Sequence, residues 1–106
     1  MTALSIRLVH HSCHSVLVLG GELDGISAPL LRLPVDTVLD TGRRHLVIDT
    51  TDLTFCDSSG LRALLGAQDS LTLAGATMEL SGVRGLLHRV LDLTGLARSF
   101  TTSPLP

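Results

Sequence analysis

The sequence contains no lysine, because all eight of its cationic residues are arginines. P-loop enzymes and protein kinases bind the phosphates of their nucleotide with a lysine at a fixed place in the motif. The missing lysine therefore excludes both kinds of nucleotide-driven phosphotransferase as an activity of this chain.

Cysteine is scarce, and the two that are present, Cys13 and Cys56, do not form a C-x-x-C motif. Their spacing indicates neither a thiol–disulfide redox centre nor a disulfide framework. We expect two free thiols in a reducing compartment.

Long hydrophobic runs are also missing, since no segment approaches the roughly 18 uninterrupted apolar residues of a membrane-spanning helix. Arg7 interrupts the amino-terminal apolar stretch, which is not typical of a signal peptide. We therefore expect a cytoplasmic protein without membrane insertion. A basic excess is absent too, with a formal net charge of −2, so no nucleic-acid partner is expected.

What the sequence does contain fits one small domain. Of its 106 residues, 44% are apolar, enough to bury a core without disulfides or a metal. We predict one domain over residues 1–100 and a disordered tail over residues 101–106, "TTSPLP".

Four segments have the apolar pattern of strands. Apolar and polar residues alternate over residues 4–8, and residues 15–19 form a second short apolar segment. The nearly continuous run "HLVID" is typical of a central strand covered on both faces, and "ATMEL" predicts a further strand. Gly20 and Gly21 are expected to end the second strand, so that "GGELDGISA" forms a loop.

Helical spacing separates these strands. We expect a first helix with Ser27 as N-cap and a kink or late start at Pro34. A second helix should follow "DSSG" and end near Gly75, and a third should have Ser81 as N-cap, followed by a short turn and strand within residues 94–100. The alternation predicts an α/β fold with a mixed sheet of four to five strands and helices packed on it.

The segment "DSSGL" offers three interpretations, of which helix capping is the simplest. Asp57 or Ser58 can accept a hydrogen bond from a first-turn amide, worth about 1 kcal/mol. Capping does not explain the second hydroxyl, nor Gly60 in the first turn, where glycine destabilises a helix by about 1 kcal/mol relative to alanine. A glycine there leaves the backbone open to close approach by a partner.

A catalytic serine is the second interpretation. The motif lacks the first glycine of G-x-S-x-G and has no base beside it in sequence, although a histidine could approach in the fold. His10, His11 and His14 form a cluster, but no ligand pair follows downstream, so we expect solvated histidines, no metal and no cofactor. The candidate bases are His10, His11, His14, His45 and His88.

Phosphorylation is the third interpretation. A phosphoserine adds a charge of about −1.5 to −2 and three acceptor oxygens. The first-turn amides and the helix dipole accommodate that charge. Asp57, with Glu22 and Asp24 from the other loop, would add like charge, so a partner shaped for a neutral hydroxyl would meet bulk and repulsion.

The order of these segments resembles the STAS domain over about residues 4 to 100. More narrowly, it resembles the anti-sigma factor antagonists of bacterial partner-switching systems. The most specific part is a hydrophobic strand followed by D-L-x-x-x-D-S-S-G-L. The matching pieces after the first two strands are "GELD" (Gly21 to Asp24), "HLVIDTTDLTFCDSSGLRALL" (His45 to Leu65) and "LTGL" (Leu93 to Leu96).

The resemblance implies a non-enzymatic switch. The unphosphorylated protein would bind an anti-sigma factor with serine kinase activity and so free a sigma factor. The kinase would phosphorylate Ser58, with Ser59 as the alternative acceptor, and a PP2C-type phosphatase would reverse the step. Asp57 would orient the Ser58 hydroxyl and cap the helix. The implied partner-binding residues are Glu22, Asp24, Asp57, Ser58, Ser59, Gly60 and Leu61.

Two features depart from the family pattern. Pro34 interrupts the first helix, and the sequence ends at Pro106, where the family normally adds a final helix, so we expect that helix to be missing. Two other functions stay open. One is a STAS subunit used only for docking, in a stress-signalling scaffold or on a lipid transporter, and the other is a small hydrolase using Ser58 or Ser59.

Overall fold

The computed structural model of the protein describes residues 3–103. They form one mixed sheet of five strands in the order β1-β2-β3-β4-β5, in which only β1 and β2 run antiparallel. This confirms the predicted α/β fold with a mixed sheet. The strands are β1 (Leu4–His10), β2 (Ser15–Leu23), β3 (His45–Cys56), β4 (Thr77–Ser81) and β5 (Thr101–Ser103).

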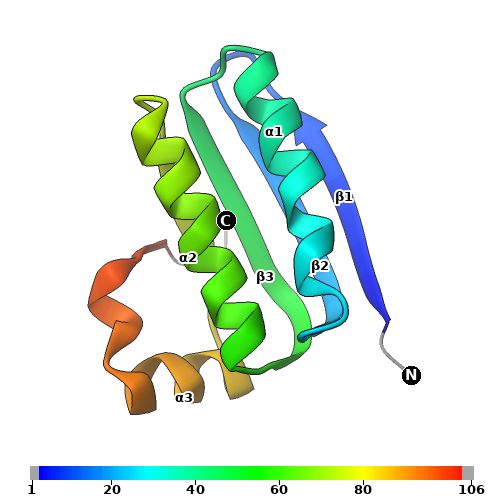
Figure 1. The fold of residues 1–106 in the computed structure, drawn as a ribbon, viewed down its shortest axis with the longest axis vertical. Coiled ribbons are helices and arrows are strands. Elements are labelled where there is room, and N and C mark those ends of the chain that lie inside the picture. The colour runs from blue at the N-terminus through cyan, green and yellow to red at the C-terminus, as the bar shows by residue number, and fades with distance from the viewer. Residues whose placement is uncertain (1–2, 104–106) are drawn as a thin grey trace.

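Helices α1 and α2 lie side by side on one face of the sheet, and α3 lies near the carboxyl end of β4 (Figure 1). Within residues 3–103, no helix is long and apolar enough to cross a membrane. The helical elements are η1 (Ala28–Leu31), α1 (Arg32–Asp40), α2 (Ser58–Leu73), α3 (Gly85–Thr94) and η2 (Leu96–Ser99).

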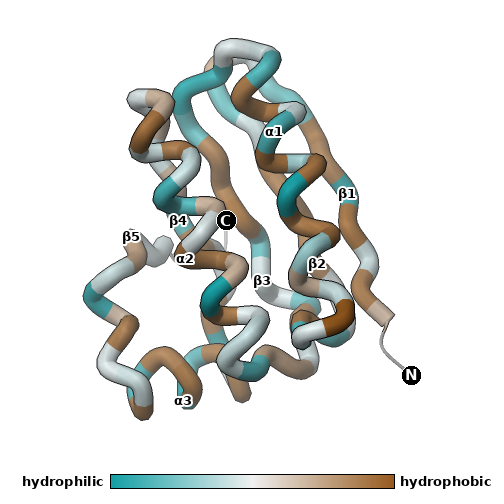
Figure 2. Tube along the Cα trace, in the orientation of Figure 1, coloured by the Kyte–Doolittle hydropathy of each residue, from teal (hydrophilic) through white to brown (hydrophobic). Residues whose placement is uncertain are grey.

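The core lies between the sheet and these helices. Alternate residues of the central strands, such as Leu17, Leu19 and Ile48, are fully buried, and they pack against Leu64 and Leu71 of α2. Figure 2 shows the hydrophobic segments of β3 behind the two helices. β3 is paired on both sides over residues 46–49, and its last two residues, Phe55 and Cys56, pair with Glu22 and Leu23 of β2, which holds the following turn in a fixed position.

Pro34 is accommodated by a late helix start, one of the two predicted outcomes. A 3₁₀ turn over η1 precedes α1, and Pro34 is the third residue of α1. A proline in the first turn of a helix removes no intrahelical hydrogen bond, because the amides there have no acceptor within the helix.

The loop predicted for residues 20–28 is shorter than expected, because Gly20 and Gly21 continue β2. The β2–β3 register shifts on either side of them, and Gly21 has a φ of 90°, which glycine adopts without strain. Glycines that signal a strand end in sequence here mark an irregular stretch inside a strand.

Both serine N-caps predicted for α1 and α3 are wrong. Ser27 precedes η1 without a side-chain capping bond, and its hydroxyl instead donates to the Glu22 carbonyl. Ser81 ends β4, so that α3 begins four residues later with Arg84 as N-cap.

The segment predicted as a disordered tail begins with a strand. Residues Thr101–Ser103 form β5 and pair with β4, so the prediction is wrong for these three residues. Residues 104–106 lie outside the described part of the chain. The expected absence of a final helix concerns the chain after β5 and therefore also lies outside the described residues.

Candidate functional site

Asp57 caps α2, as the sequence predicts. The residue has extended backbone angles, and its Oδ1 accepts a hydrogen bond of 2.9 Å from the Gly60 amide. Its carbonyl accepts from the Leu61 amide at 2.9 Å, the first bond of the helix. Asp57 therefore holds the turn after β3 through both its side-chain carboxylate and its backbone carbonyl.

The two serines of the motif occupy different surroundings. Ser58 is the first residue of α2 and is exposed, whereas Ser59 is half-buried beside Gly25 of the loop after β2. A Cβ added to Gly25 would lie 3.5 Å from the Ser59 hydroxyl. The Ser58 hydroxyl is thus the more accessible of the two.

The first-turn amides make this helix end suitable for an anion. Gly60 donates to Asp57, while the amides of Ser58 and Ser59 precede the first intrahelical bond. Such amides, together with the helix dipole, stabilise negative charge. Asp57 does not hydrogen-bond the Ser58 hydroxyl within residues 3–103, so its expected role in orienting that hydroxyl has no contact to support it.

The loop between β2 and η1 is held by its own side chains. Asp24 Oδ1 accepts from the amides of Ile26 at 2.9 Å and Ser27 at 3.1 Å. The buried Ser27 hydroxyl accepts from the Asp24 amide at 3.0 Å and donates to the Glu22 carbonyl at 2.8 Å. These bonds give the loop a defined shape.

The loop and the α2 turn meet at Gly60. A Cβ on Gly60 would lie 2.4 Å from the Leu23 carbonyl oxygen, a contact that no real side chain makes. The same carbonyl accepts from the Asp57 amide at 3.3 Å. Since Leu23 and Cys56 are paired at the carboxyl ends of β2 and β3, the structure brings Glu22 and Asp24 to the same edge of the sheet as Ser58.

Two of the predicted contact residues, Gly60 and Leu61, are buried. Leu61 is 2% exposed and belongs to the core, and Gly60 is buried against Leu23. The first turn of α2 rotates both residues toward the sheet, and their predicted part in binding stays a prediction. They hold the turn in place.

Sequence reasoning missed two exposed apolar side chains at this edge. Ile26 in the loop is 79% exposed, and Phe55 near the end of β3 is 40% exposed. An apolar residue inside a polar loop was the available signal for Ile26. Phe55 gave none, because alternation along a strand does not tell which face is left uncovered.

Four of the five histidines lie at the opposite end of the sheet from Ser58. His10 ends β1, His11 and His14 lie in the β1–β2 connection, and His45 begins β3, whose 12 residues end at Cys56. A strand of that length spans most of the 33 Å long axis of the molecule, so none of these imidazoles can serve a serine at the far end as a base. His88 lies 3.2 Å from Asp92, and both side chains are on the exposed side of α3.

Neither a reactive thiol nor a metal site is found near Ser58 among residues 3–103. Burial, together with the neighbouring Asp57 carboxylate, raises the pKa of the Cys56 thiol to about 11, so the thiolate is scarce at neutral pH. Among residues 3–103, no group of three histidine, cysteine or acidic side chains could hold a metal ion. His11 and His14 stack on each other with ring centroids 4.7 Å apart.

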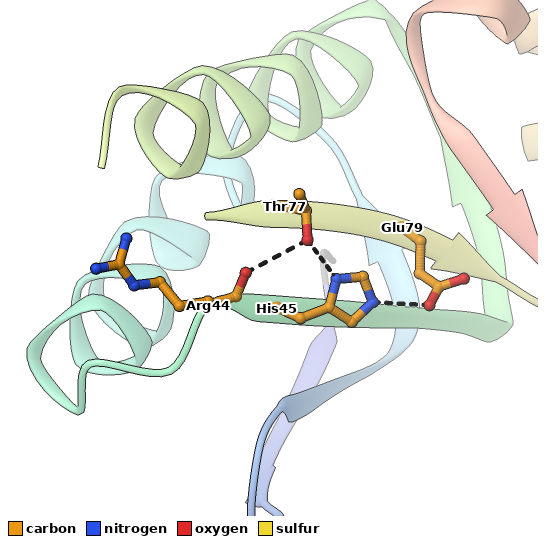
Figure 3. Close-up of polar contacts among 4 residues, drawn as sticks. All are labelled: Arg44, His45, Thr77 and Glu79. Atoms are coloured by element: carbon orange, nitrogen blue, oxygen red, sulfur yellow. Dashed lines mark hydrogen bonds and ion pairs between the residues drawn. The ribbon is translucent and has the colours of Figure 1, made fainter. Parts of the chain in front are cut away.

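His45 instead joins β3 to β4 (Figure 3). Its Nε2 lies 2.8 Å from Glu79 Oε1, and its Nδ1 lies 2.6 Å from the Thr77 hydroxyl, which in turn bonds the Arg44 carbonyl. The hydrogen bond from His45 lowers the pKa of Glu79, and hydrogen bonding from Ser103 on β5 adds to this. The histidine that sequence analysis offered as a base thus has a structural partner.

Replacing Glu79 with glutamine is expected to lower the free energy of unfolding by roughly 0.5–1 kcal/mol at pH 7. A lowered carboxyl pKa means that the stabilisation is present above the ordinary glutamate range and is lost as pH falls through the folded-state pKa. The difference between wild type and Glu79→Gln should therefore shrink as pH falls below the ordinary glutamate pKa of about 4.3, and disappear once the pH is below the folded-state pKa. Urea unfolding of both proteins, followed by far-ultraviolet circular dichroism at pH 7 and at a pH below the folded-state pKa of Glu79, measures the two free energies. An equal difference between the proteins at the two pH values would contradict the prediction.

The comparisons with known proteins agree with this geometry. The STAS domain family profile matches residues 5–105. The anti-sigma F factor antagonist of Paenibacillus polymyxa is 33% identical over 94 residues, which cover 88% of this chain and 80% of that protein. The anti-sigma-B factor antagonist of Listeria monocytogenes is 30% identical over 84 residues, covering 79% of this chain and 74% of that one.

A solved structure gives the same result for the fold. The crystal structure of an anti-sigma factor antagonist from Mycobacterium paratuberculosis superposes with a TM-score of 0.81 at 26% identity, covering 98% of this chain and 86% of that one. Fold, family profile and sequence identity therefore agree, and the chain belongs to the STAS domain family, among the anti-sigma factor antagonists.

Proposed function

We propose that this protein switches partners through phosphorylation of Ser58. In the unphosphorylated state it binds an anti-sigma factor with serine kinase activity in the cytoplasm and thereby frees a sigma factor. Phosphorylation of Ser58 by that kinase ends the interaction, and a PP2C-type phosphatase restores it. The protein itself catalyses no reaction in this cycle.

The position of Ser58 is the observation that carries the proposal. Its hydroxyl is exposed at the first residue of α2, beside the Asp57 cap and the ordered loop that begins at Asp24. A kinase can reach this hydroxyl without unfolding the turn. The names of the related proteins, which are antagonists of anti-sigma factors, supply the class of partner.

The same edge has the properties of a protein-binding surface. Ile26 and Phe55 expose apolar side chains at the loop and at the end of β3. Apolar and aromatic side chains at the centre of an interface contribute most of the binding energy, and polar groups surround them. Glu22, Asp24 and Asp57 provide the polar part and make the edge acidic.

Incubation with the cognate anti-sigma kinase and Mg-ATP should add one phosphate, detectable by intact-protein mass spectrometry. Because trypsin cleaves after Arg44 and Arg62, both serines fall in one peptide, and fragment ions must separate them. Ser58→Ala should abolish the modification, whereas the matched variant Ser59→Ala should retain it.

Two results would count against this proposal. Phosphate on Ser59 in the wild-type protein would move the switch to the half-buried hydroxyl. No phosphate at all, under conditions in which the kinase modifies another antagonist, would leave the protein as a docking subunit whose serines have no signalling role.

A further inference from the structure

β1 forms an open edge of the sheet. It pairs only with β2, and within residues 3–103 no other strand lies against it. The Glu22 amide donates to the Ala3 carbonyl at 2.8 Å, which fixes the phase of the ladder. Backbone N–H and C=O groups of alternate residues point the same way along a strand, so Ser5 and Arg7, like Ala3, direct theirs toward β2.

The alternate residues Leu4, Ile6 and Leu8 therefore direct their N–H and C=O groups away from the sheet. Natural edge strands usually prevent pairing with another chain by a proline, a bulge or an inward-pointing charge. β1 contains no proline, pairs with β2 without a register shift, and has no charged side chain on its helix-facing side. This edge is open to strand addition.

An apolar groove runs along the same edge. Its volume is about 490 Å³, and none of the residues that line it is charged. On its α1 side, Leu33 is 73% exposed and Leu30 is 55% exposed. The lining residues are Leu4, Ile6 and Leu8 of β1, together with Pro29, Leu30, Leu33, Pro34 and Thr37.

We propose that β1 pairs antiparallel with β1 of a second copy of this chain, centred on Ile6, so that the two sheets become one. The two-fold axis then stands perpendicular to the sheet and keeps both α1 helices on the same side. Ile6 faces Ile6 of the second copy, and Leu4 faces its Leu8. All these residues point their backbone groups outward, which allows about six hydrogen bonds between the copies.

The sequence of β1 is self-complementary in this register. Across the edge, Arg7 lies opposite Ser5 of the second copy, on the face away from the helices. Centring the pair on Arg7 would place two guanidinium groups opposite each other with Cα atoms only about 4.5 Å apart, and like charges in that position are destabilising. The charge on Arg7 therefore selects the Ile6 register.

A second copy fits better than an unrelated strand. A partner must present three successive apolar side chains to the groove and no cation opposite Arg7, and β1 itself satisfies both conditions. The surface is also separate from the Ser58 turn, which lies at the carboxyl end of β3, two strands further into the sheet. Dimer formation and partner switching can thus be tested independently.

Sedimentation equilibrium of the full chain, from micromolar to millimolar concentration, should show a monomer–dimer equilibrium. Leu33→Glu should raise the dimer dissociation constant by about tenfold or more, because it places a charge in the apolar groove. Leu73→Glu is the matched control, since Leu73 is 90% exposed on α2 and lies outside the groove. It should leave the constant at the wild-type value.

Cross-linking tests the register with Arg7 kept in place. In a Cys13→Ser background, Ile6→Cys should form a disulfide between copies, because a hydrogen-bonded pair has a Cα separation of about 5.5 Å. A mixture of Ser5→Cys and Val9→Cys should not, since those positions meet only in the Arg7-centred register. A wild-type protein that stays monomeric at millimolar concentration, a Leu33→Glu protein that dimerises normally, or cross-linking only in the mixture would overturn the proposal.

Discussion

Phosphorylated on Ser58, the protein is expected to bind its anti-sigma factor more than about a hundredfold more weakly than the unmodified form. The phosphate adds a charge of about −1.5 to −2 at an edge that already carries Asp57, Asp24 and Glu22. Repulsion and bulk against a surface shaped for a hydroxyl should reduce the binding free energy by about 3 kcal/mol. Ser58→Asp should bind the anti-sigma factor about tenfold or more weakly than the wild-type protein. Ser58→Ala should bind it whether or not ATP is present.

The chain provides its own labelling site for this measurement. Cys13 is exposed, whereas Cys56 is buried and has a raised pKa, so a maleimide dye should react at Cys13 alone. Cys13 lies in the β1–β2 connection, at the end of the sheet remote from Ser58. Fluorescence anisotropy of the labelled protein against the anti-sigma factor gives the dissociation constants.

Ser70→Asp is the matched control, because it adds the same charge to an exposed position late in the same helix. Its affinity should equal that of the wild-type protein. If Ser58→Asp and Ser70→Asp weaken binding equally, the effect comes from net charge and the local switch is refuted. If neither does, the interface lies elsewhere on the molecule.

Gly60→Ala is expected to lower the free energy of unfolding by about 3 kcal/mol or more. The added methyl carbon would lie 2.4 Å from the Leu23 carbonyl oxygen and 2.9 Å from the Leu23 Cγ. The obstacle is backbone, which cannot rotate away, so the loop after β2 or the start of α2 must move. The loss exceeds the gain of about 1 kcal/mol that alanine brings to a helix.

Gly66→Ala in the same helix is the control. A Cβ at Gly66 meets nothing within 4 Å, so alanine there should stabilise the protein by about 0.5–1 kcal/mol. Thermal unfolding of both variants, followed by circular dichroism, should give midpoint changes of opposite sign. Equal changes would show that Gly60 is in the helix for reasons unrelated to the contact with Leu23.

The strands and helices were largely readable from local patterns. Alternation in β1, the apolar run of β3 and the spacing within α2 each reflect one buried face, which a sequence records directly. The incorrect predictions share another cause. Gly20 and Gly21 stay in β2 because β1 and β3 pair with it on both sides, and Ser81 stays in β4 because its carbonyl accepts from the Thr50 hydroxyl at 2.9 Å.

The sequence by itself determined the family and the chemistry available at the turn after β3. The motif of an acid, two hydroxyls and a glycine before an apolar helix identifies the relatives, and it places a cap and a modifiable hydroxyl in consecutive positions. These properties are local, since a cap and a helix N-terminus depend on residues within one turn of each other.

Only the tertiary structure decided which serine is accessible and why the motif contains a glycine. Ser59 is half-buried because it lies beside Gly25, and Gly60 is required because the Leu23 carbonyl occupies the space of a side chain. Both contacts join residues more than thirty positions apart in the chain. Such contacts follow from the parallel pairing of β2 with β3, which brings the loop after β2 and the turn after β3 together. The local sequence pattern of neither segment indicates this pairing.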